Sequence, residues 1–338
     1  MKRDQYWDSL KFILIFLVVY VHCISKYSPS GSVNLALFNF LLTFLMPMFI
    51  FVSGMFSHIK DRNKYKLGIL RIMETYIVFQ VVIILLRGNI TIRSIPSIII
   101  YPQFMLWYLL CLVSWRLMVY FIPEKVIRNY PIWVILTCIF ISLFGGFIPV
   151  GSVFSLQRTM TFLPFFFLGY YAKNIELKKH IAKIPSFLAF AILLSVFLIH
   201  FFILNRPLLF VFLGKTTYWS NVEFSPLLLC FFRCLFLLSA TIVGVMVMRL
   251  VPTSPLLSRW GNITLFIYIY HSFAIGALRL AIKHDYFPPN MWILIILAVV
   301  ITMGLVLLSH IKVLNILLNP ISYFLKKKEQ SCYLINKE

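Results

Sequence analysis

The chain alternates between long apolar runs and short connectors that contain charge, proline or glycine. Most runs approach the length of about 20 residues that a helix needs to cross the hydrocarbon of a bilayer. The sixth is short enough for a tilted or partly re-entrant segment, and the eighth is long enough to tilt. We predict an all-α polytopic membrane protein of about ten transmembrane helices, with nine or eleven as alternatives. The runs are 12–28, 35–57, 70–87, 103–122, 131–149, 158–172, 185–204, 224–250, 262–282 and 290–311.

The charges in the connectors predict the orientation of the chain. If the N-terminus lies inside, 21 of the 31 Lys and Arg residues fall on the cytoplasmic side and eight on the outer side. The remaining two, Arg116 and Arg233, lie within the membrane. Cytoplasmic loops of membrane proteins carry such an excess of positive charge. We therefore predict that both ends of the chain are cytoplasmic.

The composition agrees with lipid as the main solvent, because 61% of the residues are hydrophobic and only 12% are charged. A soluble domain is closer to half apolar and a quarter charged. The net charge of +21 would favour nucleic acid in a soluble protein. Here we interpret the charge mainly as the basic residues that set the orientation of the chain and attract anionic lipid. Any further positive charge would serve to bind a phosphorylated donor. No partner nucleic acid is expected.

The pattern predicts a single transmembrane domain at 1–325 and a short basic cytoplasmic tail at 326–338. The first run lacks a small-residue cleavage site, so we expect a retained helix rather than a signal peptide. The six cysteines form neither a CxxC motif nor a Cys/His cluster. Neither a metal site nor a disulfide framework is therefore predicted.

A polar stripe, Asp8, Lys11 and His22, marks the first helix. Lys11 and His22 are eleven residues apart, so they share one helical face and stand about 16 Å apart along it. Ionisable groups at membrane depth are costly and indicate function by default. The stripe would place a cation at the cytoplasmic mouth and an imidazole beyond mid-membrane. A donor whose phosphates bind at the cytoplasmic end could thus extend toward an acceptor that arrives from outside the membrane.

His22 suits general base catalysis, because an ordinary imidazole takes up a proton near neutral pH. The alternative is a packing residue that hydrogen-bonds a neighbouring carbonyl group. For His22 alone the two interpretations are balanced, and the spacing from Lys11 and Asp8 favours a site.

Other polar residues within or beside the runs each have a functional and a structural interpretation. Arg116 and Arg233 are suited to phosphate or carboxylate, or they extend toward the cytoplasmic face. Arg71 lies one turn from Glu74 and can form a local ion pair. Arg158 opens the sixth run and can be an interface anchor.

Two further candidates are aromatic or imidazole side chains. His271 follows Tyr268 and Tyr270 near mid-membrane, where a packing role is the more common one. Trp107 and Tyr108 lie where the fourth helix enters from outside, and an aromatic belt also explains them. The chain contains no HExxH, GxSxG or P-loop motif, so metalloprotease, serine hydrolase and nucleotide hydrolase activities lack support.

The chain resembles one family in the order of its motifs. The opening RDQYWDSLKFILIFLVVYVH resembles the first helix of membrane acyltransferase family 3, where Asp-x-x-Arg is followed by ten residues and then a histidine. The segments FLMPMFIFVSGMF, LWYLLCL, FLPFFFLGYYAK and GNITLFIYIYH follow in the family's order, from Arg3 to about His271. One departure is Lys11, which stands where the family has arginine and lacks its bidentate fork.

The resemblance implies a bacterial inner-membrane O-acetyltransferase. Such enzymes move acetyl from cytoplasmic acetyl-CoA to a sugar of surface polysaccharide or its lipid-linked precursor, with the first-helix histidine as the proposed catalytic residue. The chain resembles the stand-alone branch, which includes a group labelled fucose 4-O-acetylase-like.

On this basis we expect His22 to be the general base, with Asp8 orienting the stripe. Donor phosphates would meet Lys11, Arg71 and Arg116, and the acceptor or acyl group would meet Arg158, Trp107, Arg233 and His271. Two other classes stay open. A transporter or flippase of a lipid-linked sugar would also be polytopic and basic inside, and a structural subunit of an export complex would depend little on His22.

Overall fold

The computed structural model describes residues 4–25, 32–87, 100–150, 153–173, 175–203, 213–220, 223–283 and 291–324, without the side chains of 87 and 279–283. Within these ranges the chain is helical and contains no strand. Ten helices correspond to the ten predicted runs: α1 (Gln5–Ile24), α2 (Val33–Met55), α3 (Arg62–Arg87), α5 (Trp107–Phe121), α7 (Pro131–Phe144), α8 (Leu156–Ala172), α10 (Ser186–Phe202), α12 (Pro226–Leu250), α14 (Thr264–Lys283) and α15 (Met291–Leu308).

Shorter elements connect these helices: α6 (Glu124–Asn129), α9 (Leu177–Ala182), α13 (Pro255–Trp260), α16 (Lys312–Leu318) and the 3₁₀ turns η2 (Gly145–Phe147), η3 (Val153–Ser155) and η4 (Tyr218–Ser220). Of the helices in the described ranges, α1, α2, α3, α12 and α15 are long and apolar enough to cross a membrane, and α5, α7, α10 and α14 are shorter apolar helices. The prediction of an all-α polytopic membrane protein is confirmed. The predicted tail 326–338 lies outside the described residues.

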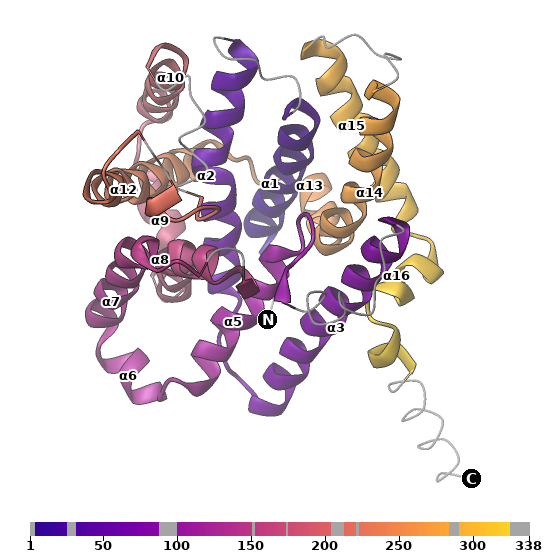
Figure 1. Cartoon of the computed structure of the whole chain (residues 1–338), viewed down its shortest axis with the longest axis horizontal. Coiled ribbons are helices and arrows are strands. Elements are labelled where there is room, and N and C mark those ends of the chain that lie inside the picture. The colour runs from indigo at the N-terminus through magenta and orange to yellow at the C-terminus, as the bar shows by residue number, and fades with distance from the viewer. Residues whose placement is uncertain are drawn as a thin grey trace.

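The first helix lies in the middle of the molecule (Figure 1), where it packs against α2 on one side and α13, α14 and α15 on the other. It begins at Gln5, seven residues before the start of the predicted run at 12. The carboxylate of Asp4 explains this start, because it accepts a hydrogen bond from the backbone N–H of Tyr6 at 3.0 Å and caps the helix. Asp8 and Lys11 therefore belong to α1 itself.

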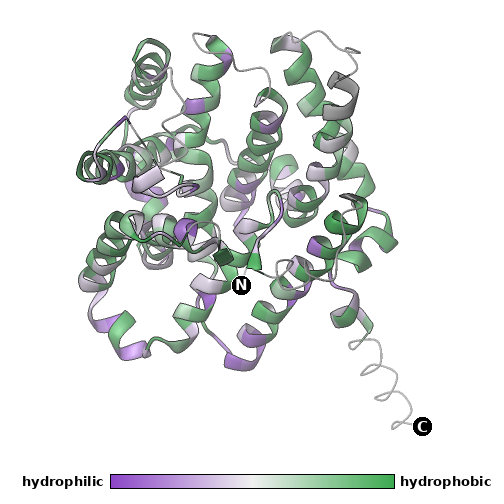
Figure 2. Ribbon diagram, viewed as in Figure 1, coloured by the Kyte–Doolittle hydropathy of each residue, from purple (hydrophilic) through white to green (hydrophobic). Residues whose placement is uncertain are grey.

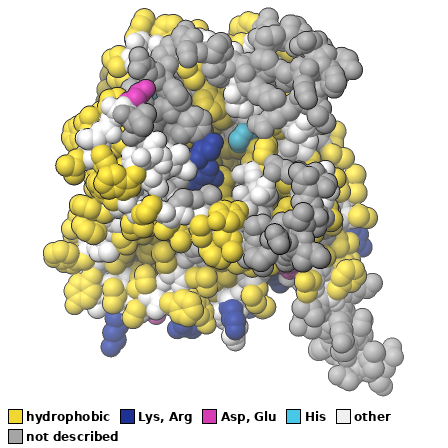
Figure 3. All heavy atoms as spheres, in the orientation of Figure 1, with side chains coloured by type: hydrophobic (Ala, Val, Ile, Leu, Met, Phe, Trp, Pro, Cys, Tyr) yellow, Lys and Arg dark blue, Asp and Glu magenta, His cyan; other side chains and the backbone are white. Residues whose placement is uncertain are grey.

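The outer surface of the bundle agrees with a lipid environment. Hydrophobic residues cover most of the ribbon, whereas hydrophilic residues gather at the start of α3 and in α6 (Figure 2). Basic side chains line the same lower edge in the space-filling view (Figure 3). We take this edge as the cytoplasmic end, because the predicted cytoplasmic connectors lie there.

Two glycines allow α2 and α8 to approach each other closely. A Cβ atom at Gly54 would lie 1.9 Å from the carbonyl oxygen of Phe166, and one at Gly169 would lie 1.8 Å from that of Phe51. Small residues at such positions let helix backbones pack closely in membranes, where van der Waals contact drives association. The close contact between α2 and α8 thus requires glycine at both positions.

Replacing either glycine by alanine should destabilise the bundle, because the clashing atoms are backbone atoms that a rotamer change cannot move. We expect Gly54→Ala and Gly169→Ala each to cost about 1–3 kcal/mol. The measurement is the thermal unfolding midpoint of the detergent-solubilised protein. Gly304→Ala in α15 is the matched control, since a Cβ atom there meets no atom within 4 Å. Equal midpoints for all three variants would contradict the close α2–α8 contact.

Candidate functional site

Two histidines from helices far apart in the sequence meet inside the bundle. The rings of His22 on α1 and His271 on α14 have centroids 5.6 Å apart at an angle of 41°. His271 is fully buried, whereas His22 is partly exposed. The structure therefore brings together the residue predicted as the base and one predicted to contact substrate.

The hydrogen bonds of His271 define its tautomer. Its Nδ1 lies 2.9 Å from the carbonyl oxygen of Ile267, and a carbonyl oxygen only accepts, so Nδ1 carries the proton. In a neutral imidazole the other nitrogen then has a free lone pair. That atom, Nε2, is buried and has no hydrogen-bond partner among the residues that the structure describes. A buried acceptor without a partner is costly, so His271 offers an acceptor atom near His22.

Aromatic side chains extend from the histidine pair toward α5. Tyr268 lies one helical turn before His271, with ring centroids 6.0 Å apart. It also contacts Tyr108, at 5.4 Å between centroids. The hydroxyl of Tyr268 donates to the backbone carbonyl of Met105, and Tyr108 shares a 2.5 Å hydrogen bond with Ser53. These bonds fix the two tyrosines relative to α14, α5 and α2.

At the end of this aromatic chain lies a cation. The ring of Trp107 is next to that of Tyr108, at 6.3 Å between centroids. The guanidinium of Arg158 lies over Trp107 at 4.4 Å from its ring centroid, and Tyr268 is within electrostatic range of Arg158. In the space-filling view, basic and histidine side-chain atoms are visible in a hollow in the middle of the face (Figure 3). Four predicted residues, His22, His271, Trp107 and Arg158, thus belong to one connected cluster.

The cytoplasmic end of α1 forms a second part of the site. Lys11 pairs with Asp8 at 2.5 Å between Nζ and Oδ1, and the Asp8 side chain is only 5% exposed. The ammonium group of Lys11 also lies 5.2 Å from the ring centroid of Phe56. Gly261 follows α13 directly beside Asp8, where a Cβ atom would lie 2.1 Å from the Asp8 carbonyl oxygen. Close packing of α13 therefore holds this part of the helix.

A cavity of about 650 Å³ opens beside this pair. It lies between the start of α1, the end of α2 and the segment that joins α8 to α9, and it is rich in charged side chains. Its lining consists of Asp4, Trp7, Asp8, Lys11, Met55, Phe56, Ala172, Lys173, Ile175, Glu176, Leu177, Lys178 and Lys179.

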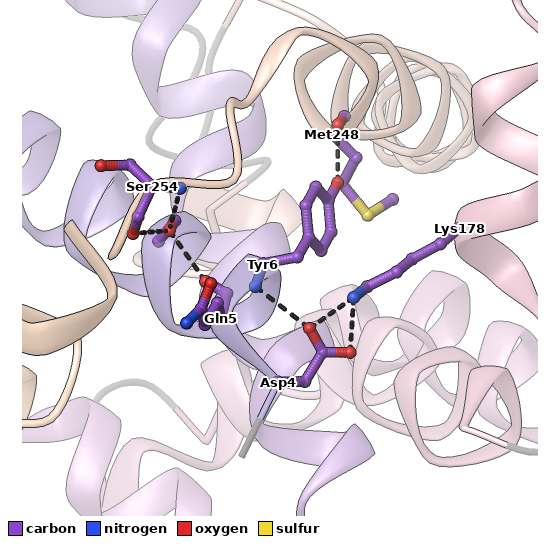
Figure 4. Close-up of polar contacts among 7 residues, drawn as sticks. Asp4, Gln5, Tyr6, Lys178, Met248 and Ser254 are labelled. Carbon is purple, nitrogen blue, oxygen red and sulfur yellow. Dashed lines mark hydrogen bonds and ion pairs between the residues drawn. The ribbon is translucent and has the colours of Figure 1, made fainter. Parts of the chain in front are cut away.

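Hydrogen bonds fix the first turns of α1 beside the cavity (Figure 4). Lys178 donates to the Asp4 carboxylate, and the hydroxyl of Tyr6 donates to the carbonyl oxygen of Met248 at 2.6 Å. Ser9 donates to the carbonyl oxygen of Ser254 at 3.0 Å. The first turns of α1 are thus bound to α9, to the end of α12 and to the residue before α13.

Most cations at the cavity already have acidic partners. Lys11 pairs with Asp8, Lys178 with Asp4 and Lys179 with Glu176. Lys173 has no ion pair with any described acid. Burial and the nearby charge of Lys60 hold the pKa of Lys173 below its usual range. An anion bound in the cavity would stabilise the charged form of Lys173.

Two residues predicted to bind the donor do not line the cavity. Arg71 is exposed on α3, and its neighbour Glu74 accepts from the backbone N–H of Ile321 at 2.5 Å and from the hydroxyl of Ser322. The guanidinium of Arg116 lies 5.9 Å from the ring centroid of Tyr65. Donor binding by Arg71 and Arg116 stays a prediction.

Arg233 lies in a different cluster. It is fully buried and donates to the carbonyl oxygen of Ser142 at 3.2 Å. Its guanidinium lies 4.6 Å from the ring centroid of Tyr218, whose hydroxyl donates to the carbonyl oxygen of Leu143 at 2.9 Å. These contacts fasten α7, α12 and η4 to one another and include no residue of the histidine cluster. Acceptor binding by Arg233 stays a prediction.

The sequence did not single out Tyr268, Ser53 or Lys173 as site residues. A signal existed for Tyr268, because a residue three positions before His271 lies on the same helical face. Tyr270, between them, instead donates to the carbonyl oxygen of Leu314 at 2.8 Å. Lys173 becomes a candidate only through the tertiary contact of the α8–α9 connector with α1. Within the described ranges, no group of three His, Cys, Asp or Glu residues is arranged to hold a metal ion.

Comparison with known proteins gives one finding that covers nearly the whole chain. A family model described as an acyltransferase domain matches residues 4–310. This range contains every residue of the histidine cluster and of the cytoplasmic cavity. No curated protein and no solved structure matches the chain. The match identifies the chain as a member of membrane acyltransferase family 3.

Proposed function

We propose that this acyltransferase moves acetyl from cytoplasmic acetyl-CoA to a sugar hydroxyl of a cell-surface polysaccharide or its lipid-linked precursor, in the inner membrane of a bacterium. The observation that carries the proposal is the pair His22 and His271, with ring centroids 5.6 Å apart inside an acyltransferase bundle. Two imidazoles in one enclosed place can accept and hold a proton without a metal ion.

The chemistry assigns His22 as the general base. His22 takes the proton of the sugar hydroxyl as the oxygen attacks the thioester carbonyl carbon. The tetrahedral intermediate then collapses, the carbon–sulfur bond breaks, and the CoA thiolate leaves and takes up the proton. The Nε2 lone pair of His271 is suited to accept a hydrogen bond from the acceptor hydroxyl or from protonated His22. His271 therefore acts with His22 on the same proton.

The cytoplasmic cavity is the proposed binding place for the phosphates of the donor. Charge-assisted hydrogen bonds from lysines are typical of phosphate sites, and Lys11 and Lys173 line the cavity. Lys11 stands about 16 Å from His22 along α1. The thioester of CoA lies at the end of a long flexible arm, which can extend along the helix from a cytoplasmic phosphate site.

Loss of either histidine should abolish acyl transfer. General base catalysis contributes about 10²–10⁴-fold, so we expect His22→Ala and His271→Ala each to lower transfer of radiolabelled acetyl from acetyl-CoA to membrane glycan by at least about 100-fold. His200→Ala is the matched control. His200 is also buried in a helix, but it binds Thr43 and the carbonyl oxygen of Val196 instead.

Each variant must insert and express as the unaltered protein does. Wild-type transfer by His22→Ala would show that the base is assigned wrongly. Movement of an intact lipid-linked sugar without any acetyl transfer would favour the transporter instead.

Removal of the Lys173 charge should weaken donor binding and leave the chemical step in place. We expect Lys173→Ala to raise the KM for acetyl-CoA about tenfold or more, the usual effect of losing a hydrogen bond from a charged group, with kcat nearly unchanged. Lys125→Ala is the control, because Lys125 is exposed on α6 and is not among the residues of the cavity. Equal KM values for the two variants would place the donor elsewhere.

A further inference from the structure

Arg158 has no acidic partner in the part of the chain that the structure describes. The described acids are Asp4, Asp8, Asp61, Glu74, Glu124, Glu176 and Glu223. Asp8, Asp4 and Glu176 form ion pairs with Lys11, Lys178 and Lys179, and Glu74 is bound to the backbone at Ile321 and Ser322. Arg158 instead lies over the ring of Trp107 and interacts electrostatically with Cys111 and Tyr268. Among the described residues, the guanidinium is therefore a charge without an acidic counter-ion.

Such a charge is costly inside a membrane protein, where ionisable residues normally pair with one another. Contact with a tryptophan face favours the cation but leaves its charge in place. The guanidinium fork can bind both oxygens of a carboxylate or phosphate at once. An anion supplied from outside the chain would complete this arrangement.

The chain holds Arg158 and Trp107 in a fixed relation. The sulfhydryl of Cys111 receives a hydrogen bond from Thr159 at 3.2 Å, and the indole N–H of Trp115 donates to the carbonyl oxygen of Thr159 at 3.0 Å. These bonds tie the first turn of α8 to α5. Phe162 stacks on Trp107, with centroids 5.9 Å apart, so packing also fixes the indole.

The backbone just before each of these two residues is strained. Phe104 has φ 55°, and Phe154 and Ser155 have φ 46° and 53°. Side chains other than glycine avoid this left-handed region, and such strain persists where the surroundings over-determine it, often near ligands. The segments that lead into α5 and α8, which carry Trp107 and Arg158, thus both contain backbone in a costly conformation.

The position of the cation indicates which substrate carries the anion. Arg158 is linked through Tyr268 to His271 and so to His22. The phosphates of the donor have their own lysines at the cytoplasmic cavity, on the other side of the three turns of α1 between Lys11 and His22. An anion bound at Arg158 would therefore belong to the acceptor.

Resting on the proposed function, we propose that the acceptor carries a carboxylate or phosphate close to the hydroxyl that is acetylated, and that Arg158, positioned by Trp107, binds this group and selects the acceptor. The shared chemistry is a planar or tetrahedral oxyanion that a guanidinium binds with two hydrogen bonds. Arg158 is then a specificity-determining residue, distinct from the base and from the donor lysines.

The first test locates the acetyl group. Surface glycan from cells with the protein and from a deletion strain is compared by tandem mass spectrometry. We expect the acetyl that disappears in the deletion strain to lie on a residue that carries a carboxylate or phosphate, or on its direct neighbour. Carboxyl reduction and mild hydrofluoric acid distinguish the two anions, since the first converts carboxylates to alcohols and the second cleaves phosphodiesters. An acetyl on a neutral residue between neutral neighbours would overturn the proposal.

The second test uses membranes with glycan from the deletion strain as acceptor and radiolabelled acetyl-CoA as donor. We expect Arg158→Gln to raise the acceptor KM about tenfold or more, with the KM for acetyl-CoA unchanged, and Arg158→Lys to restore part of the loss. Arg62→Gln is the matched control, because Arg62 also lies over an aromatic ring, that of Tyr120 at 4.6 Å, but at the start of α3.

The outcomes of these tests distinguish failure of the proposed function from failure of the acceptor-binding role of Arg158. A fall in kcat with an unchanged acceptor KM would assign Arg158 to the oxyanion of the tetrahedral intermediate and overturn the acceptor role. If no acetyl disappears in the deletion strain, the proposed function fails, and the acceptor role falls with it. If acetyl disappears but lies on a neutral residue with neutral neighbours, the acyltransferase stands and only the role of Arg158 fails.

Discussion

A charged or polar side chain inside a bilayer has to be enclosed by protein, and the arrangement around α1 follows from this constraint. The helix carries Asp8, Lys11 and His22, and it lies at the centre of the bundle between α2 and the group α13, α14 and α15. The Asp8 side chain is 5% exposed, and the ring of His22 lies beside that of His271. The remaining helices surround α1 and shield these groups from lipid. On one side α2 covers α1, and α8 packs closely against α2 at Gly54 and Gly169.

The enclosed groups divide by depth into two functional parts. The cytoplasmic part is a cavity with three paired lysines and Lys173, which has no ion pair with a described acid, and it is suited to phosphates. The inner part is a cluster of imidazole, phenol, indole and guanidinium groups, suited to a sugar hydroxyl and a nearby anion. The polar face of α1 joins the two parts, which gives one physical reason for a stripe that extends over about three turns of helix.

Much of the fold could be predicted from the sequence, because hydrocarbon thickness and backbone hydrogen bonding leave few alternatives for an apolar run. Each predicted run contains a helix, and the family resemblance is confirmed over residues 4–310. Local periodicity also relates Lys11 to His22. It cannot relate His22 to His271, since that contact depends on which face of α14 packs against α1. For the same reason the sequence could not show that Lys173 lines the cavity with Lys11, or that Arg233 serves a separate cluster with Tyr218.

The central claim is that one site accepts its donor from the cytoplasmic end of α1 and transfers acetyl to a glycan at the histidine pair. Sealed membrane vesicles of the two orientations test this most directly, with radiolabelled acetyl-CoA added only to the outside medium. The account predicts acetylated glycan in inside-out vesicles, where the cavity at Lys11 and Lys173 faces the medium. It predicts none in right-side-out vesicles until they are permeabilised. Equal labelling in both orientations, or labelling only in right-side-out vesicles, would contradict it.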